Sequence, residues 1–153
     1  MASTISAATL TVTHTEALTL NGVDRGVTNT LTIASINEVD HRILTVDTSA
    51  ARTIATLGTT VGSGEFIKGN VKYIRVTNKD DTNYVTLGLI QNNTGTEATH
   101  LKLEAGQSFV IYNDDIDIRD DAIAFSGSFV ELKSISAQAN SANVDVELFV
   151  AST

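Results

Sequence analysis

Apolar and polar residues alternate with a period of two along most of this chain, and clusters of turn-forming residues interrupt the alternation. The segment VKYIRV is the clearest case, because Ile74 and Val76 fall on one face of an extended chain. Val71, Tyr73 and Arg75 fall on the other face. A period of two is typical of a β-strand, in which successive side chains point to opposite sides. The segment is therefore predicted to be a strand with one buried face.

A polar turn and a second strand follow directly. Lys79–Asn83 is rich in Asp and Asn, which hydrogen-bond to their own backbone and favour hairpin loops. Val85, Leu87 and Leu89 then share one face of the returning strand. The two strands are predicted to form a hairpin. Further strands are expected at residues 101–103 and 109–112.

The N-terminal part of the chain has the same pattern in a less regular form. Leu10, Val12 and His14 alternate with threonines. Asn21-Gly22 follows and is the strongest signal for a two-residue hairpin turn in the chain. Strands are expected at residues 10–20, 27–36, 42–46 and 53–57.

The C-terminal part completes an all-β pattern. Apolar residues at alternate positions give the last strand, Val144–Val150, a wholly apolar face. With about eleven or twelve short strands and no substantial helix, the predicted fold is an antiparallel β-sandwich or jelly roll. The length predicts one domain over 1–153, with an extended arm at 1–16 and a glycine-rich joint at 58–69. Two further strands are expected at residues 122–125 and 128–137. The residues expected in the core are Ile74, Val76, Leu87, Leu89, Leu103, Val110, Leu132, Val146 and Leu148.

Composition narrows the classes of partner. The net charge of −8 and the pI of about 4.6 argue against nucleic acid, because phosphate binding needs clustered Lys and Arg. No apolar run approaches the roughly 20 residues that a membrane helix needs. The N-terminus lacks the basic and apolar blocks of a signal peptide. These features predict a soluble protein made in the cytoplasm, with neither nucleic acid nor a membrane as partner.

One acidic segment is a candidate cation site. Five carboxylates within it could supply the oxygen ligands that Ca²⁺ prefers. The segment lacks the glycine and the glutamate of an EF-hand loop, and its aspartates alternate with Ile116 and Ile118. A solvated acidic strand edge is therefore the favoured interpretation, and no metal is assigned. The candidate calcium ligands are Asp114, Asp115, Asp117, Asp120 and Asp121.

No motif in the chain points to catalysis. His14, His41 and His100 lie in different expected strands, and none has a second ligand at a recognised metal spacing. There is no nucleophile elbow, no phosphate-binding loop and no dinucleotide fingerprint. The sequence predicts a protein that is not an enzyme and has no catalytic residue and no cofactor.

Three segments together carry a resemblance. INEVDHRILTV at 36–46, VKYIRVTNKDDTNYVTLGL at 71–89 and LKLEAGQSFVIYN at 101–113 resemble small virion proteins of tailed bacteriophages, especially phages of marine cyanobacteria and other marine bacteria. The likeness covers roughly residues 18 to 125. It implies a structural virion protein, most specifically a capsid decoration (cement) protein on the capsid surface. The implied partners are further copies of the chain, in a homotrimer, and the major capsid protein.

Two other functions remain open at this point. Tail and neck proteins of virions use similar β-sandwiches, so the resemblance leaves the place in the particle undecided. A jelly roll that binds a carbohydrate or a cation through the acidic segment is the alternative from a different class. A cupin-like enzyme would need its histidines to converge in the fold.

Overall fold

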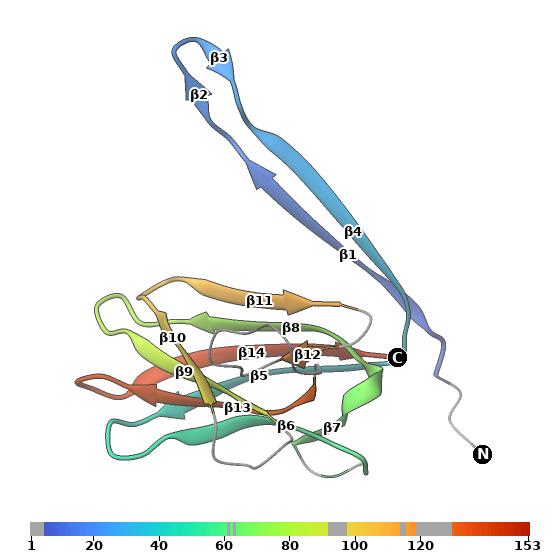
Figure 1. Ribbon diagram of the computed structural model, residues 1–153, viewed down its shortest axis with the longest axis vertical. Coiled ribbons are helices and arrows are strands. Elements are labelled where there is room, and N and C mark those ends of the chain that lie inside the picture. Colours follow the sequence, from blue (N-terminus) through green and yellow to red (C-terminus); the bar gives the residue numbers. More distant parts are fainter. Residues whose placement is uncertain (1–4, 61, 63, 92–97, 114–115, 119–129) are drawn as a thin grey trace. The chain divides into compact units, whose positions relative to one another are not determined.

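The computed structural model describes residues 5–60, 62, 64–91, 98–113, 116–118 and 130–153. Nearly all regular structure in these residues is β-strand, which confirms the all-β prediction (Figure 1). One short 3-10 turn, η1 (Lys68–Asn70), is the only helical element among them. The strands are β1 (Ala8–Glu16), β2 (Thr19–Leu20), β3 (Val23–Asp24), β4 (Val27–Ile36), β5 (Glu38–Val46), β6 (Arg52–Gly58), β7 (Glu65–Ile67), β8 (Val71–Asn78), β9 (Val85–Gln91), β10 (Ala98–Leu103), β11 (Ser108–Tyr112), β12 (Asp117–Ile118), β13 (Val130–Ala139) and β14 (Val144–Ser152).

The chain divides into two compact units. The first comprises Met1–Glu38 together with Thr153, and the second comprises Val39–Ser152. The first unit holds β1 to β4, and the second holds β6 to β14 and nearly all of β5. The glycine-rich segment 58–69 lies inside the second unit, where β7 pairs in parallel with β6.

The first unit is a long β-hairpin. β1 pairs with β4, and β2 pairs with β3 closer to the turn. Asn21 and Gly22 form that turn with φ values of 52° and 77°. Positive φ at both central residues is the geometry of a type I′ turn, whose twist matches that of the flanking strands. The Asn21-Gly22 hairpin turn predicted from the sequence is therefore confirmed.

The second unit is a β-sandwich of two sheets. The β13 sheet has the strand order β10-β9-β13-β6-β7, with β12 paired to β13. The β14 sheet has the order β11-β8-β14-β5. The two sheets share one apolar core, because strands of both contribute side chains to a single cluster of buried residues. Its largest fully buried members include Ile54, Leu87, Leu132 and Ile135 from the β13 sheet and Ile74, Val76, Val146 and Leu148 from the β14 sheet.

The connection between β8 and β9 differs from the prediction. Lys79–Asn83 was expected to close a hairpin, but β8 and β9 belong to different sheets, so this loop passes from one sheet to the other. The predicted inward residues Ile74 and Val76 of β8 and Val85, Leu87 and Leu89 of β9 are all buried, because the two strands face the same core from opposite sides. Polar turn residues suit a hairpin and a crossing loop equally, so local sequence could not distinguish the two.

Two face assignments are corrected. Val71 was placed with Arg75 but is fully buried, because Lys72 is an extra residue opposite the step from Ala151 to Ser152 and shifts the alternation. Val110 was expected in the core but is 40% exposed. Its neighbours on β11 pack against the core instead, since Ile111 pairs with inward-facing Ile74 and Val110 with Arg75. The other predicted core residues are all buried. The strand predicted at 122–125 lies outside the described residues.

Candidate functional site

The two faces of the hairpin differ sharply in composition. Leu10 pairs with Ile33, and Leu20 pairs with Val23 nearer the turn. Directly opposed residues of an antiparallel pair lie on the same face. The backbone N–H of Arg25 donates to the carbonyl of Leu18 at 2.7 Å, so the same register continues between the two ladders. One face, called the apolar face below, carries Leu10, Val12, Leu18, Leu20, Val23, Val27, Leu31 and Ile33.

The opposite face, called the threonine face below, is made mainly of threonines. Thr11 pairs with Thr32, and Thr15 pairs with Thr28 with a hydrogen bond of 3.3 Å between their hydroxyls. Its members are Thr11, Thr13, Thr15, Thr28, Thr30 and Thr32, all of them exposed. A two-stranded sheet with one apolar and one polar face has the pattern of a sheet that packs on something through its apolar side.

The apolar face is uncovered toward the turn. Leu18 is 56% exposed, Leu20 is 55% exposed and Val23 is 49% exposed. An isolated two-stranded hairpin is marginally stable in water, because it has no second layer to bury such side chains. This surface is therefore the strongest candidate for an interaction site in the first unit.

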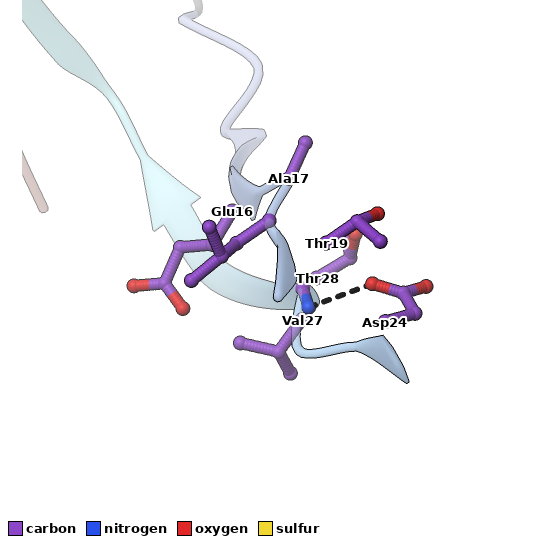
Figure 2. Close-up of a pocket in the computed structure, with 8 residues that line it drawn as sticks. Glu16, Ala17, Thr19, Asp24, Val27 and Thr28 are labelled. Carbon is purple, nitrogen blue, oxygen red and sulfur yellow. Dashed lines mark hydrogen bonds between the residues drawn. The ribbon is translucent and has the colours of Figure 1, made fainter. Parts of the chain in front are cut away.

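A local joint separates the two ladders of the hairpin (Figure 2). The Asp24 carboxylate accepts a hydrogen bond of 2.8 Å from the backbone N–H of Gly26. A side chain at Gly26 would collide with the carbonyl oxygen of Glu16, so the close backbone approach requires glycine. An open hollow of about 500 Å³ lies at this joint, and its lining contains no histidine, lysine or arginine. Its lining consists of Glu16, Ala17, Leu18, Thr19, Asp24, Gly26, Val27 and Thr28.

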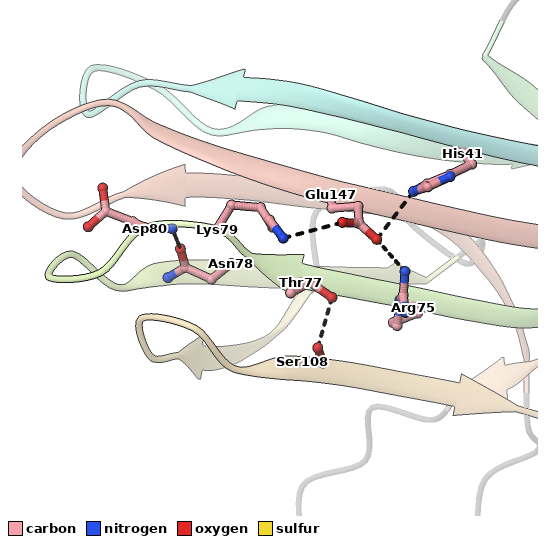
Figure 3. Close-up of polar contacts among 8 residues, drawn as sticks. All are labelled: His41, Arg75, Thr77, Asn78, Lys79, Asp80, Ser108 and Glu147. Carbon is pink, nitrogen blue, oxygen red and sulfur yellow. Dashed lines mark hydrogen bonds and ion pairs between the residues drawn. The ribbon is translucent and has the colours of Figure 1, made fainter. Parts of the chain in front are cut away.

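The outer face of the β14 sheet carries a cluster of charges around Glu147 (Figure 3). Arg75 of β8 donates to Oε1 of Glu147, and Nε2 of His41 lies 3.2 Å from the same oxygen. Lys79 Nζ lies 3.6 Å from Oε2. Three cationic or potentially cationic groups thus surround one carboxylate, whose side chain is only 16% exposed.

This arrangement fixes the charge of Glu147. Burial raises the pKa of the carboxyl, but the Arg75 charge, the His41 hydrogen bond and the Lys79 charge outweigh it and hold the pKa below the ordinary glutamate value. A carboxylate whose pKa is lowered in this way is ionised at neutral pH and links β5, β8 and β14. A general acid or base, in contrast, has a pKa near the working pH.

Aromatic and apolar side chains flank the charges on the same outer face. The ring of Phe149 meets the rings of Tyr73 and His41 edge to face, with centroids 5.8 and 5.7 Å apart. The exposed large apolar residues of the second unit, among those described, all belong to β5 and β11 at the two edges of the β14 sheet. They are Val39, Ile43, Val110 and Tyr112. These four residues lie on the two edge strands, and Phe149 and Tyr73 lie on the strands between them.

The candidate calcium segment is only partly placed. Asp117 lies in β12, where it pairs with Glu131 of β13. The other four candidates, Asp114, Asp115, Asp120 and Asp121, lie outside the described residues. Among the residues that are described, no three His, Cys, Asp or Glu side chains gather in a way that could hold a metal ion.

The histidines lie on separate strands. His14 is on β1, His41 is on β5 of the β14 sheet, and His100 is on β10 of the β13 sheet. The strands of His41 and His100, β5 and β10, belong to different sheets. Among the described residues, these two histidines do not take part in a group that could hold a metal ion.

The sequence analysis found the alternation of apolar residues and threonines along the hairpin strands, but it did not combine the two strands into common faces, and it missed the charge cluster. The charge cluster joins β5, β8 and β14, which are far apart in the chain. The only sign of it in the sequence is that His41, Arg75 and Glu147 each fall on the outward face of their own strand. The two faces of the hairpin could have been found by fixing the register at Asn21-Gly22 and counting outward.

No helix in the described part of the chain is long and apolar enough to cross a membrane. The chain matches no protein-family model, no curated protein and no solved structure.

Proposed function

We propose that this chain is a non-enzymatic structural protein of a phage virion, and most specifically a capsid decoration (cement) protein. In this role it binds the capsid surface, together with copies of itself in a homotrimer, and stabilises contacts between major capsid subunits. The observation that carries the proposal is the hairpin, whose apolar face displays Leu18, Leu20 and Val23 about half exposed. A stably folded domain that presents such a surface favours assembly as its role.

The architecture of the second unit supports the same class. Eight longer strands of the described residues, β5, β6, β8, β9, β10, β11, β13 and β14, build its two sheets. When these eight strands are numbered from one to eight in chain order, they lie side by side as 1-8-3-6 in the β14 sheet. In the β13 sheet they lie side by side as 2-7-4-5. We propose that this sandwich is a jelly roll, an arrangement common in viral capsid and lectin domains. That argument is an analogy of fold, and the hairpin carries the functional inference.

The chemistry of the described surface is compatible with a binding role. The cluster around Glu147 contains internally paired charges, and its carboxylate is held ionised by Arg75, His41 and Lys79.

A binding experiment with separated virion parts tests the proposal. The purified chain is mixed with capsid shells that lack it, and separately with tails of the same phage, and each is sedimented. We expect saturable binding to shells. Binding to tails alone would transfer the proposal to a tail or neck protein, and binding to neither would overturn it. Binding to a carbohydrate array only when calcium is present would favour the lectin-like alternative.

A further inference from the structure

We propose that hairpins of neighbouring copies pack against one another through their apolar faces, with the threonine faces turned to water. This inference names the partner of the hairpin as a second copy of the chain, and it rests on the proposed assembly function. It assigns the contact between copies to residues of the first unit.

The first argument is the separation of the two faces. All eight large apolar residues between positions 8 and 35 lie on the apolar face, and the paired threonines lie on the other. Six cross-strand pairs, from Leu10–Ile33 to Leu20–Val23, build this face. With a rise of about 3.4 Å per residue and about 4.8 Å between strands, it is roughly 35 Å long and 10 Å wide. A largely apolar surface of that order marks an interaction site on a soluble protein.

The second argument is the charge on the apolar face. Besides its apolar residues, the face carries Glu16, paired with Val27, Arg25, opposite Leu18, and the polar pair His14–Asn29. One acid and one base at neighbouring cross-strand levels make the face electrically balanced and complementary to itself. Two copies side by side can place Glu16 of one next to Arg25 of the other. A polar pair within an apolar contact also fixes the register in which the copies meet.

The third argument concerns the other exposed surface of the same chain. A hairpin laid on the outer face of the β14 sheet would cover Glu147 and Arg75, which form a close ion pair. Removing such charges from water is costly unless the new contact satisfies them. The exposed large apolar residues of that surface lie on the edge strands β5 and β11, on either side of this ion pair, so a hairpin that covered them would also cover the charges. The hairpin of a second copy matches the apolar face, because that hairpin presents the same apolar face.

Cysteine cross-linking of the full chain tests the contact, since the native chain has no cysteine. His14→Cys places a thiol near the middle of the apolar face, and Leu20→Cys places one near the turn. Thr13→Cys and Thr19→Cys are matched controls one residue away on the opposite face. All four positions are exposed, so the fold tolerates the changes. Each purified variant is oxidised in solution and the fraction of covalent dimer is measured.

The pattern of cross-links gives the outcome. Hairpins related by the threefold axis of the proposed homotrimer run parallel, so both His14→Cys and Leu20→Cys should form covalent dimer, with little dimer from the controls. Equal yields from both faces, or no cross-link from the apolar face, would overturn it.

A second measurement does not depend on thiol chemistry. The double variant Leu20→Ser/Val23→Ser is compared with Thr13→Ser/Thr30→Ser by light scattering. Two large apolar side chains contribute enough burial that the first variant should weaken association at least about 100-fold, while the second should not. Unchanged association of both variants would overturn the contact.

The result is separate from that of particle binding. Cross-linking through the apolar face without any binding to virion parts would keep this contact and reject the proposed function. Binding to shells by a chain that stays monomeric and uncross-linked would keep the function and reject the contact.

Discussion

The side chain of Asn78 joins three backbone segments at the end of β8. Its Nδ2 donates to the carbonyls of Asn83, at 2.8 Å, and Leu103, at 3.2 Å, and its Oδ1 accepts from the N–H of Asp80 at 2.9 Å. The residue is fully buried, so these partners replace water for all of the groups involved. This one amide holds the point at which the chain leaves the β14 sheet and enters the β13 sheet.

Replacing Asn78 with Ala should therefore lower the free energy of unfolding. The buried carbonyl of Leu103 and the partly buried carbonyl of Asn83 and N–H of Asp80 would each lose a partner, at a total cost of about 1–3 kcal/mol. Urea denaturation measures the change, and exposed Asn140→Ala is the control, expected to stay within about 0.5 kcal/mol of the native chain. Equal stability of the two variants would show that the amide does not hold the crossing.

Glu147 gives the fold a pH-dependent contribution. Its pKa is below the ordinary glutamate value of 4.5, because Arg75, His41 and Lys79 outweigh the opposing effect of burial. The ionised group therefore stabilises the fold above its unfolded pKa, and this contribution is lost as the pH falls through the lower folded pKa. The native chain should exceed Glu147→Gln in unfolding free energy by about 1–3 kcal/mol at pH 7.

The same comparison below pH 4.5 supplies the check. The difference between the native chain and Glu147→Gln should shrink as the carboxyl becomes protonated. Denaturant titrations at several pH values measure it, and a difference that is constant with pH would contradict the assigned ion pairs.

Among the elements, the hairpin depends on a single tight contact. Gly26 lies where β4 begins, and any side chain there would meet the backbone of Glu16. Gly26→Ala should disturb the pairing of β1 with β4 while the sandwich keeps its structure. Two-dimensional NMR should show shifts for residues 8–36 and unchanged resonances in the second unit.

Gly69→Ala is the matched control for this change, because a side chain at Gly69 would meet open space. Spectra of Gly69→Ala should match the native chain in the hairpin. A Gly26→Ala spectrum that leaves the hairpin unchanged would mean that the joint can relax at no cost.

Individual elements were more predictable than their connections. The predicted strand 27–36 coincides with β4, because alternation and the Asn21-Gly22 turn are both local signals. The crossing from β8 to β9 was missed, because Lys79–Asn83 has the same residues that a hairpin loop would have. Val110 was misplaced because a strand of five residues, β11, offers apolar residues on both faces. Of the candidate sites, the metal proposal falls mainly on residues that are not described, and the charge cluster needed the tertiary pairing of three strands.

At the scale of the whole molecule, the buried core and the proposed assembly surface belong to different units. The sandwich holds the buried cluster, and the hairpin presents apolar side chains on its surface. Changes in the core should therefore alter unfolding, whereas changes on the apolar face of the hairpin should alter association.

Core truncation tests this division. Leu87→Ala and Leu148→Ala remove fully buried side chains, one from each sheet, and should each lower the free energy of unfolding by about 2–5 kcal/mol. Val110→Ala removes an exposed side chain of the same unit and should cost less than about 0.5 kcal/mol. Thermal melts of the three variants measure this, and a Val110→Ala loss as large as the other two would place β11 in the opposite orientation.

The central claim is that the chain stabilises a capsid. The direct measurement is the unfolding temperature of shells from the same phage, recorded by calorimetry without the chain, with the native chain at saturation, and with Leu20→Ser/Val23→Ser. A ligand that binds only the folded assembly raises its unfolding temperature. The account predicts a higher shell unfolding temperature with the native chain and a smaller rise with the double variant. A shell unfolding temperature that stays the same at saturating native chain would contradict it.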